Sequence, residues 1–335
     1  MKNDSLILSI KGLSVHYKIY EGFLNVLDNI NFKVAYGERI GLIGETGCGK
    51  TTTMKTIMRL LPSQAVVPNG KIFFQEKDVL GMNQNEINKY LRKKAVMIFQ
   101  DPTASLNPVF TIGTQINDVI RNLNRKENHK NKIYEKSIKI LKDVSLPDPE
   151  RIMINYPFQL SGGMRQRICI ALAVSCDPVL LIADEPTTSL DVTIQAQILD
   201  LISELVERRK TSLILITHSL GITRGMTDRI YVMYAGTIVE ISKTESFYKN
   251  PLHPYSQGLL ASVPKLSGGG FADGIPGHIP NYLNPPLGCR FSPRCSRALP
   301  ICFTKKPPLF KVESKHEVAC FLYKNYEEER YNGNE

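Results

Sequence analysis

The sequence lacks a hydrophobic run long enough to cross a lipid bilayer. Its longest apolar runs, at residues 179–183 and 213–216, have the length of a strand, whereas a membrane-spanning helix needs about 20 consecutive apolar residues. The N-terminus also lacks the apolar segment and cleavage site of a secretory signal. We therefore expect a chain that is not secreted and does not itself span the membrane.

Repeats and a disulfide framework are also lacking. The sequence shows no repeat of the solenoid type, and its seven cysteines do not suggest paired disulfides in a chain without a secretory signal. With 42% hydrophobic and 22% charged residues, the composition is that of an ordinary globular protein. A length of 335 residues allows a large core and more than one structural unit.

The formal net charge is +10, which nucleic acid or an anionic membrane surface could exploit. The lysines are scattered, however, apart from a basic stretch at residues 122–136. We therefore interpret the excess charge as a solvated basic surface and expect no nucleic-acid partner.

The hydrophobic pattern predicts an α/β protein with an N-terminal β part. Strands are predicted at 6–18, 26–35, 39–43, 71–74, 95–99, 179–183, 212–217 and 230–234, and helices at 161–173 and 192–208. The alternation of strands and helices after residue 161 is typical of a wound α/β sheet. Between these parts, a polar helical pattern broken by prolines predicts a helical insertion at about 101–160.

A shift in composition near residue 250 predicts a domain boundary. We assign residues 1–250 to the main domain and 251–335 to a C-terminal extension. Because residues 250–310 hold much of the proline, we expect little regular structure there.

Residues 44–51 form a complete G-x-x-x-x-G-K-[ST] phosphate loop between a predicted strand and a predicted helix. The backbone N–H groups of such a loop surround phosphates, Lys50 adds a charge at the β/γ position, and the Thr51 hydroxyl can ligate Mg²⁺. The residues expected to bind a nucleoside triphosphate are Gly44, Glu45, Thr46, Gly47, Cys48, Gly49, Lys50, Thr51 and Thr52. Cys48 stands where serine is common, and its thiol is expected to be open to oxidation.

Two carboxylates follow the apolar run at 179–183. The buried strand is expected to deliver Asp184 and Glu185 to the sheet edge beside the phosphate loop. One carboxylate can hold Mg²⁺ through water, and the next can accept a proton from the attacking water.

A second glycine cluster lies at Ser161, Gly162 and Gly163, where a serine cap precedes a helix and forms a second anion site. Here the sequence resembles the ATP-binding subunits of ABC transporters over about residues 5–245, with every family motif in order. The resemblance implies an ABC-type nucleotide-binding fold with a RecA-like wound sheet, an antiparallel β part and a helical subdomain. It also implies that the LSGG motif of one subunit closes over ATP held by the phosphate loop of another.

The resemblance also assigns roles to single residues. Asp184 matches the Mg²⁺-binding aspartate, Glu185 the catalytic glutamate, Gln100 the glutamine that contacts Mg²⁺ and water, and His218 the switch histidine. Residues 189–191, ending in Asp191, match the D-loop. Tyr17 is the aromatic expected to stack on adenine, with Tyr20 and Phe23 as rivals.

Residues 99–108, 184–197 and 250–260 resemble the peptide/nickel importer branch, and this chain resembles its D-type ATPase. The resemblance implies a homologous F-type ATPase partner, two membrane permease subunits, an extracellular solute-binding protein, and a place on the cytoplasmic face of the membrane. The cargo stays open among peptides, nickel chelates and oligosaccharides. The alternatives are a soluble ABC ATPase without a transporter and a redox-regulated Fe–S module with secondary ATPase activity.

Four of the seven cysteines lie in the last 47 residues, at Cys289, Cys295, Cys302 and Cys320. Four thiolates suit a [4Fe–4S] cluster or structural Zn²⁺, although the short C-x₂₋₄-C spacing frequent in zinc sites is missing. The resemblance to D-type ATPases favours the cluster, with Arg290, Arg294 and Arg297 offsetting its charge. Four ordinary cysteines or two disulfides are the alternatives.

Overall fold

A computed structural model describes residues 5–123, 129–188, 190–263 and 274–324 of the chain. These residues divide into two compact units. The first unit comprises the chain up to Gly81 and again from Leu215 onward, and the second comprises Met82–Ile214. The predicted D-loop serine, Ser189, lies outside the described residues.

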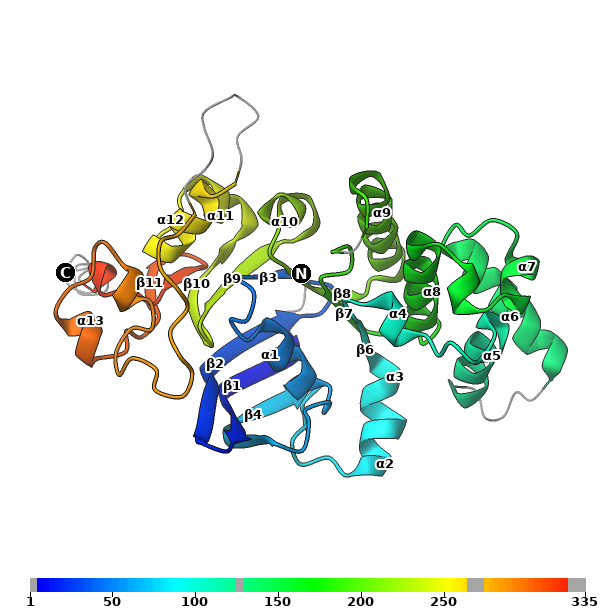
Figure 1. Cartoon of the computed structure of the whole chain (residues 1–335), viewed down its shortest axis with the longest axis horizontal. Helices are drawn as coiled ribbons and strands as arrows, with labels where there is room; N and C mark the ends of the chain where they lie inside the picture. Colours follow the sequence, from blue (N-terminus) through cyan, green and yellow to red (C-terminus); the bar gives the residue numbers. More distant parts are fainter. Residues whose placement is uncertain (1–4, 124–128, 189, 264–273, 325–335) are drawn as a thin grey trace. The chain divides into compact units, whose positions relative to one another are not determined.

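An antiparallel sheet of order β2-β1-β4-β5 begins the first unit (Figure 1). Its strands are β1 (Leu6–Ile19), β2 (Gly22–Ala35), β4 (Ala65–Phe74) and β5 (Lys77–Asp78). β1 and β2 form a hairpin in which Ile10 faces Phe32, and both side chains are buried. This sheet is the predicted N-terminal β part.

The first unit also holds the strands that lead to the phosphate loop. β3 (Arg39–Ile43) lies parallel to β9 (Arg229–Tyr234), and β10 (Thr237–Lys243) continues the sheet antiparallel to β9. At the edge, β12 (His316–Val318) pairs with β10 and β11 (Phe310–Glu313) pairs with β12. The C-terminal extension therefore adds two strands to the sheet. The helices of this part are α1 (Lys50–Ile57), α10 (Leu220–Met226) and α11 (Thr244–Lys249).

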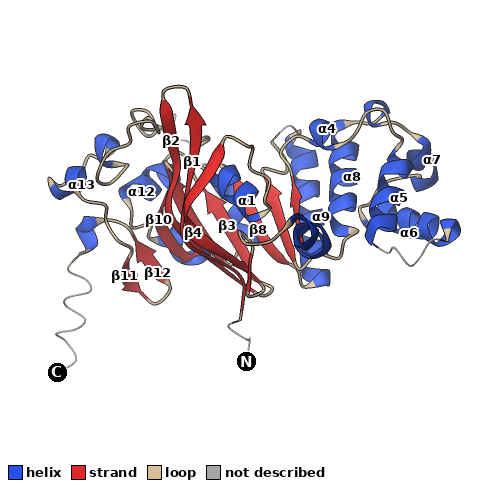
Figure 2. Cartoon of the chain, turned by 90° about the horizontal axis from the view of Figure 1, so that it is seen from below, coloured by secondary structure: helices blue, strands red, loops and turns tan. Residues whose placement is uncertain are grey.

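The second unit combines a short parallel strand pair with helices (Figure 2). β6 (Ala95–Ile98) lies parallel to β7 (Leu180–Asp184), and β8 (Ser212–Thr217) then carries the chain back into the first unit. The remaining elements are α2 (Gln84–Glu86), a π-helical turn (Ile87–Leu91), α3 (Arg92–Lys94), α4 (Pro102–Ser105), α5 (Ile112–Leu123), α6 (Lys130–Asp143), α7 (Pro149–Ile154), a 3₁₀ turn (Pro157–Gln159), α8 (Gly162–Val174) and α9 (Val192–Arg209). Within residues 101–123 and 129–160, which the structure describes, the regular elements are all helices or 3₁₀ turns.

The extension is more ordered than its proline content suggests. A helix, α12 (Pro254–Ala261), begins at a proline that needs no N–H at the first helical position, and α13 (Ile301–Thr304) and two 3₁₀ turns (Ser292–Arg294, Phe321–Tyr323) follow. The expectation of little regular structure was therefore wrong for α12. The side chain of His253 accepts the Tyr255 N–H at 3.0 Å and caps α12.

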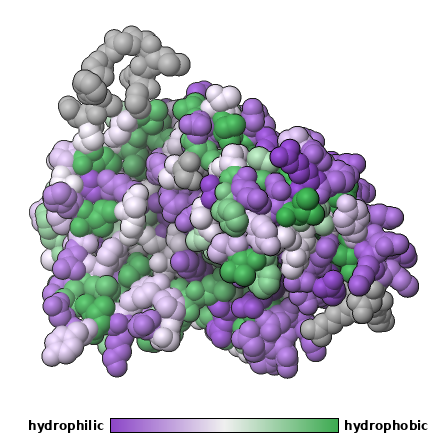
Figure 3. Space-filling model, turned by 45° about the vertical axis from the view of Figure 1, so that its right-hand side comes forward, coloured by the Kyte–Doolittle hydropathy of each residue, from purple (hydrophilic) through white to green (hydrophobic). Residues whose placement is uncertain are grey.

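Hydrophobic residues lie in small groups among hydrophilic ones on the face drawn in Figure 3. Among the helices of the described residues, none has both the length and the apolar character that spanning a membrane demands.

Candidate nucleotide site and cysteine cavity

The phosphate loop follows β3 directly and ends in α1, as predicted. Gly44 and Gly49 have φ angles of 153° and 106°, a region that L side chains rarely adopt. A Cβ at Gly44 would lie 2.1 Å from the Met233 carbonyl oxygen, so the loop can follow this path only with glycine there. The loop then enters α1, whose first N–H groups have no partner within the helix. This arrangement suits an anion.

Lys50 lies within the loop and is 5% exposed. Its Nζ donates to the carbonyl oxygens of Gly44 and Glu45, at 2.7 and 3.0 Å. The ammonium is therefore held beside the backbone that is predicted to surround the phosphates. Thr51 and Thr52 follow on the first turn of α1, both half-buried.

Cys48 is fully buried, which corrects the expectation of an oxidation-prone thiol. Burial raises the pKa of this thiol above its usual range, although Lys50 opposes the shift. Because the thiolate is the reactive form, the side chain is a packing group beneath the loop.

Asp184 and Glu185 stand where β7 ends in the second unit. Asp184 is 4% exposed, and Glu185 adopts a left-handed backbone with φ of 45°. The Gln100 side-chain amide donates to Glu185 Oε2 at 3.0 Å, and the Thr188 hydroxyl donates to the same oxygen at 3.0 Å. The structure thus brings together two of the three predicted catalytic residues. Sequence reasoning missed Thr188, which the family motif alone does not single out.

The second glycine cluster begins α8 as predicted. Ser161 is the N-cap, and its hydroxyl accepts the Met164 N–H at 3.3 Å. A Cβ at Gly163 would lie 2.9 Å from Ile194 Cγ2 in α9, so the glycine permits close packing of these helices. Ser161 is exposed and Gly162 is half-buried, which leaves this helix start accessible.

The other predicted residues lie at ends and edges of elements. His218 is exposed directly after β8, and exposed Asp191 precedes α9. Tyr17 is half-buried near the end of β1, opposite Leu24. Tyr20 lies fully exposed in the hairpin turn.

The four C-terminal cysteines line one cavity of about 10 Å³, together with His253, Phe291 and Arg297. All seven cysteines are free thiols, and burial raises the pKa of Cys289 to about 11 and also raises those of Cys295 and Cys320. The donor set suits a thiophilic metal. Within the described ranges, however, no group of three or more His, Cys, Asp or Glu side chains has the arrangement of a metal site.

Two of the three arginines expected to face a cluster point elsewhere. Arg290 donates to the carbonyl oxygens of Ala235 and Asn25, the latter at 3.0 Å. Arg294 forms an ion pair with Glu45 of the phosphate loop. Only Arg297 of the three lines the cysteine cavity, because Arg290 and Arg294 are held by partners that lie far away in the sequence.

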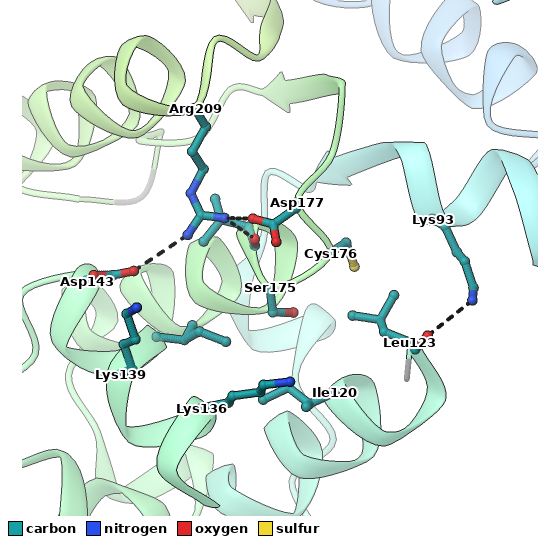
Figure 4. A pocket seen from close by; sticks show the side chains of 12 residues that line it. Lys93, Ile120, Leu123, Lys136, Lys139, Asp143, Ser175, Cys176, Asp177 and Arg209 are labelled. Atoms are coloured by element: carbon teal, nitrogen blue, oxygen red, sulfur yellow. Dashed lines mark hydrogen bonds and ion pairs between the residues drawn. The ribbon is translucent and has the colours of Figure 1, made fainter. Parts of the chain in front are cut away.

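A larger pocket of about 450 Å³ lies in the second unit between α5, α6 and the end of α8 (Figure 4). It holds Lys93, Lys136 and Lys139, with Arg209 paired to Asp143 and Asp177. None of the predicted site residues lines it.

Comparisons with known proteins identify the family of this chain. Residues 27–188 match the family model described as ABC transporter, and residues 239–302 match the oligopeptide/dipeptide transporter C-terminal region. The oligopeptide transport ATP-binding protein AppD of Bacillus subtilis (strain 168) is 41% identical, covering 95% of this chain and 97% of AppD. OppD of Escherichia coli (strain K12) is 40% identical, covering 94% and 93%.

Among solved structures, the ATP-binding cassette MJ0796, a dimer bound to ADP and phosphate, superimposes with a TM-score of 0.62 at 26% identity. It covers 71% of this chain and 98% of its own. CbiO1 of Clostridium perfringens gives a TM-score of 0.61 at 25% identity, covering 73% and 91%. The predicted fold class is thereby confirmed. On these motifs, this fold and these relatives, the chain belongs to the ABC transporter family, as an ATP-binding, ATP-hydrolysing subunit of the oligopeptide/dipeptide type.

Proposed function

We propose that this chain powers the import of peptides by binding and hydrolysing ATP. The observation that carries the proposal is the phosphate loop, whose glycine backbone and internally held Lys50 suit a triphosphate. The names of the related oligopeptide and dipeptide transport proteins favour peptides over nickel chelates and oligosaccharides.

The proposed roles follow the chemistry of each side chain. Residues 44–52 bind the phosphates, and Tyr17 stacks on adenine. Thr51, Gln100 and Asp184 offer oxygen ligands to Mg²⁺, which when bound neutralises charge on the phosphates. Glu185 accepts a proton from the attacking water, and the Gln100 and Thr188 hydrogen bonds support this role by fixing one carboxylate oxygen. His218 is assigned to the γ-phosphate.

The second glycine cluster is proposed to act on ATP held by another subunit. Ser161, Gly162, Gly163 and Asp191 would face the phosphate loop of a homologous F-type ATPase, so that nucleotide is enclosed by two chains. The exposed start of α8 supports this role. Residues 1–250 would form the ATPase domain and 251–335 the extension.

We further propose a peripheral position on the cytoplasmic face of the membrane, beneath two permease subunits that an extracellular binding protein supplies. Inactivating the gene in its host and measuring uptake of labelled di- and oligopeptides tests the cargo. Unchanged uptake of both, with a fall in uptake of another solute, would contradict peptide import.

The cysteine cavity is proposed to hold a metal centre, either [4Fe–4S] or Zn²⁺. Four thiols around one cavity support a metal, but a volume of about 10 Å³ suits only about one water-sized group. A cluster would therefore require the thiols to turn outward. Iron, sulfide and zinc analysis after anaerobic purification distinguishes the two, and the absence of all three would contradict the proposal.

A further inference from the structure

The C-terminal extension contacts the phosphate loop at three points. The guanidinium of Arg294 forms a two-pronged pair with the Glu45 carboxylate, at 2.8 and 3.0 Å. The Tyr255 hydroxyl accepts the Glu45 N–H at 2.8 Å, and the Tyr282 hydroxyl donates to the Gly47 carbonyl at 2.8 Å. Two residues of the loop are therefore held by side chains that lie more than 200 positions away in the sequence.

The Arg294 side chain is itself fixed in place. It is 4% exposed, and it also donates to the carbonyl oxygens of Ile275 and Pro276, each at 2.8 Å. A guanidinium held by several acceptors has little freedom left to lose on pairing, and its fork geometry matches a carboxylate. Arg294 therefore presents a preorganised positive charge to the loop.

Glu45 is an unusual partner for a triphosphate, because an acidic side chain in an anion-binding loop repels phosphates. Like charges only several ångströms apart near a protein surface repel one another. The pair with Arg294 neutralises Glu45 and holds its carboxylate on the side of the extension. The Tyr255 contact fixes the backbone of the same residue.

The local fold explains why Arg294 reaches the loop. The 3₁₀ turn Ser292–Arg294 follows Phe291, which is 3% exposed and packs edge-on against Tyr234. Tyr255 packs against the same two rings, at centroid distances of 4.6 Å from Tyr234 and 5.5 Å from Phe291. One aromatic cluster thus places both the arginine and the tyrosine hydroxyl beside Glu45.

We propose that Arg294 is a positioning residue for the phosphate loop, through which the C-terminal extension raises the affinity of this chain for ATP. The inference rests on the proposed nucleotide site. It assigns the extension a part in ATP binding that is separate from any metal at the cysteines.

The test compares Arg294→Ala with a matched control, Arg229→Ala. Arg229 forms a similar two-pronged pair with Glu38, and both distances are 2.9 Å. This pair lies where β3 and β9 begin, whereas the phosphate loop follows the other end of β3. The full chain is titrated with a fluorescent ATP analogue and Mg²⁺, and thermal unfolding without nucleotide is recorded alongside. We expect Arg294→Ala to weaken ATP binding about tenfold, which corresponds to about 1.4 kcal/mol. Arg229→Ala should leave the affinity within about twofold of the wild type.

Kinetics and a double-mutant cycle separate positioning from general destabilisation. In Arg294→Ala the KM for ATP should rise while kcat changes little, because the contact acts on binding. In a Glu45→Gln background the same substitution should lower the affinity for ATP less than threefold, because the repulsive charge of Glu45 is gone. Arg294→Lys keeps the charge but loses the fork geometry, so its affinity for ATP should be about threefold lower than that of the wild type. This variant carries the test if the alanine variant does not fold.

Three results would overturn the inference. These are wild-type affinity in both Arg294 variants, an equal loss in the Arg229 control, or an undiminished loss in the Glu45→Gln background. Failure of the proposed nucleotide site gives a different result, since the wild-type chain would then bind no ATP.

Discussion

At the scale of single residues, Glu185 is held at the end of β7 by an unusual backbone and two hydrogen bonds. Its φ of 45° turns the chain sharply after the buried Asp184. Residues held in sparsely populated backbone regions often occupy functional sites. Gln100 and Thr188 both donate to the same carboxylate oxygen, Oε2.

Glu185→Gln should retain ATP binding and lower the hydrolysis rate by at least about 100-fold, because the amide cannot accept the proton of the attacking water. Phosphate release measured at saturating Mg²⁺-ATP tests this. The control Glu204→Gln removes the same charge from an exposed position on α9 and should hydrolyse ATP at the wild-type rate. Fast turnover by Glu185→Gln would contradict its assignment as the general base.

Gly44→Ala tests the steric basis of the phosphate loop. The new Cβ would meet the Met233 carbonyl oxygen and sit on a left-handed backbone, so we expect a loss of at least about 2 kcal/mol in the free energy of unfolding. Gly221→Ala in α10, where a Cβ meets nothing within 4 Å, should be neutral or slightly stabilising. Equal unfolding midpoints in urea for the two variants would argue against the steric account.

At the scale of elements, the extension is anchored to the sheet by one buried carboxylate. Glu240 in β10 is fully buried and accepts the N–H groups of Leu252 and His253 and the Nε2 of His316, all within 2.9 Å. Burial alone would raise the pKa of Glu240, but these hydrogen bonds outweigh it and hold the pKa below its usual value. Burial lowers the pKa of fully buried His253 to about 4.

Both shifts predict that acid loosens the extension. The unfolded chain protonates His253 near pH 6.5 while the folded chain resists until about pH 4, so stability present above pH 6.5 is lost as the pH falls through this window. The loss approaches about 1.4 kcal/mol per pH unit and about 3 kcal/mol in all. Glu240 adds a loss of the same sign below its ordinary pKa.

Urea unfolding of the full chain between pH 7.5 and 5 measures this dependence. In His253→Asn, the amide oxygen can still cap α12 but does not titrate, so the stability should fall less steeply between pH 6.5 and 5. An identical slope in this variant would contradict the assignment to His253.

The sequence predicted elements well where local pattern decides them and poorly where distant partners do. The apolar runs of β3, β7 and β8 and the glycine loop before α1 were readable because burial and backbone chemistry are local. β10 was missed because Glu240 interrupts its apolar pattern. The buried Glu240 carboxylate is hydrogen-bonded by His316, which lies 76 residues later. The directions of Arg290 and Arg294 were likewise set by tertiary neighbours, so charge and spacing alone misassigned them to the cysteines.

At the scale of the whole molecule, the proposed function requires a second ATPase subunit. One chain offers a phosphate loop and, separately, the accessible start of α8. A helix N-terminus binds anions through its free N–H groups. The phosphate loop of one chain and the start of α8 of the other can therefore both contact one triphosphate. Nucleotide would then act as a shared ligand that favours association.

The final prediction concerns association driven by ATP. The Glu185→Gln chain, mixed with its proposed F-type partner, should form a heterodimer by light scattering when ATP is added and remain separate with ADP. Adding Ser161→Arg, which places a bulky cation at the start of α8, should abolish association while the chain still binds ATP. Lys50→Ala should weaken ATP binding itself. If the site is shared between chains, Ser161 contacts the ATP of the partner, and the substitution leaves ATP binding by the phosphate loop of its own chain intact. Loss of ATP binding in the Ser161→Arg chain would therefore show that both glycine clusters serve a single subunit.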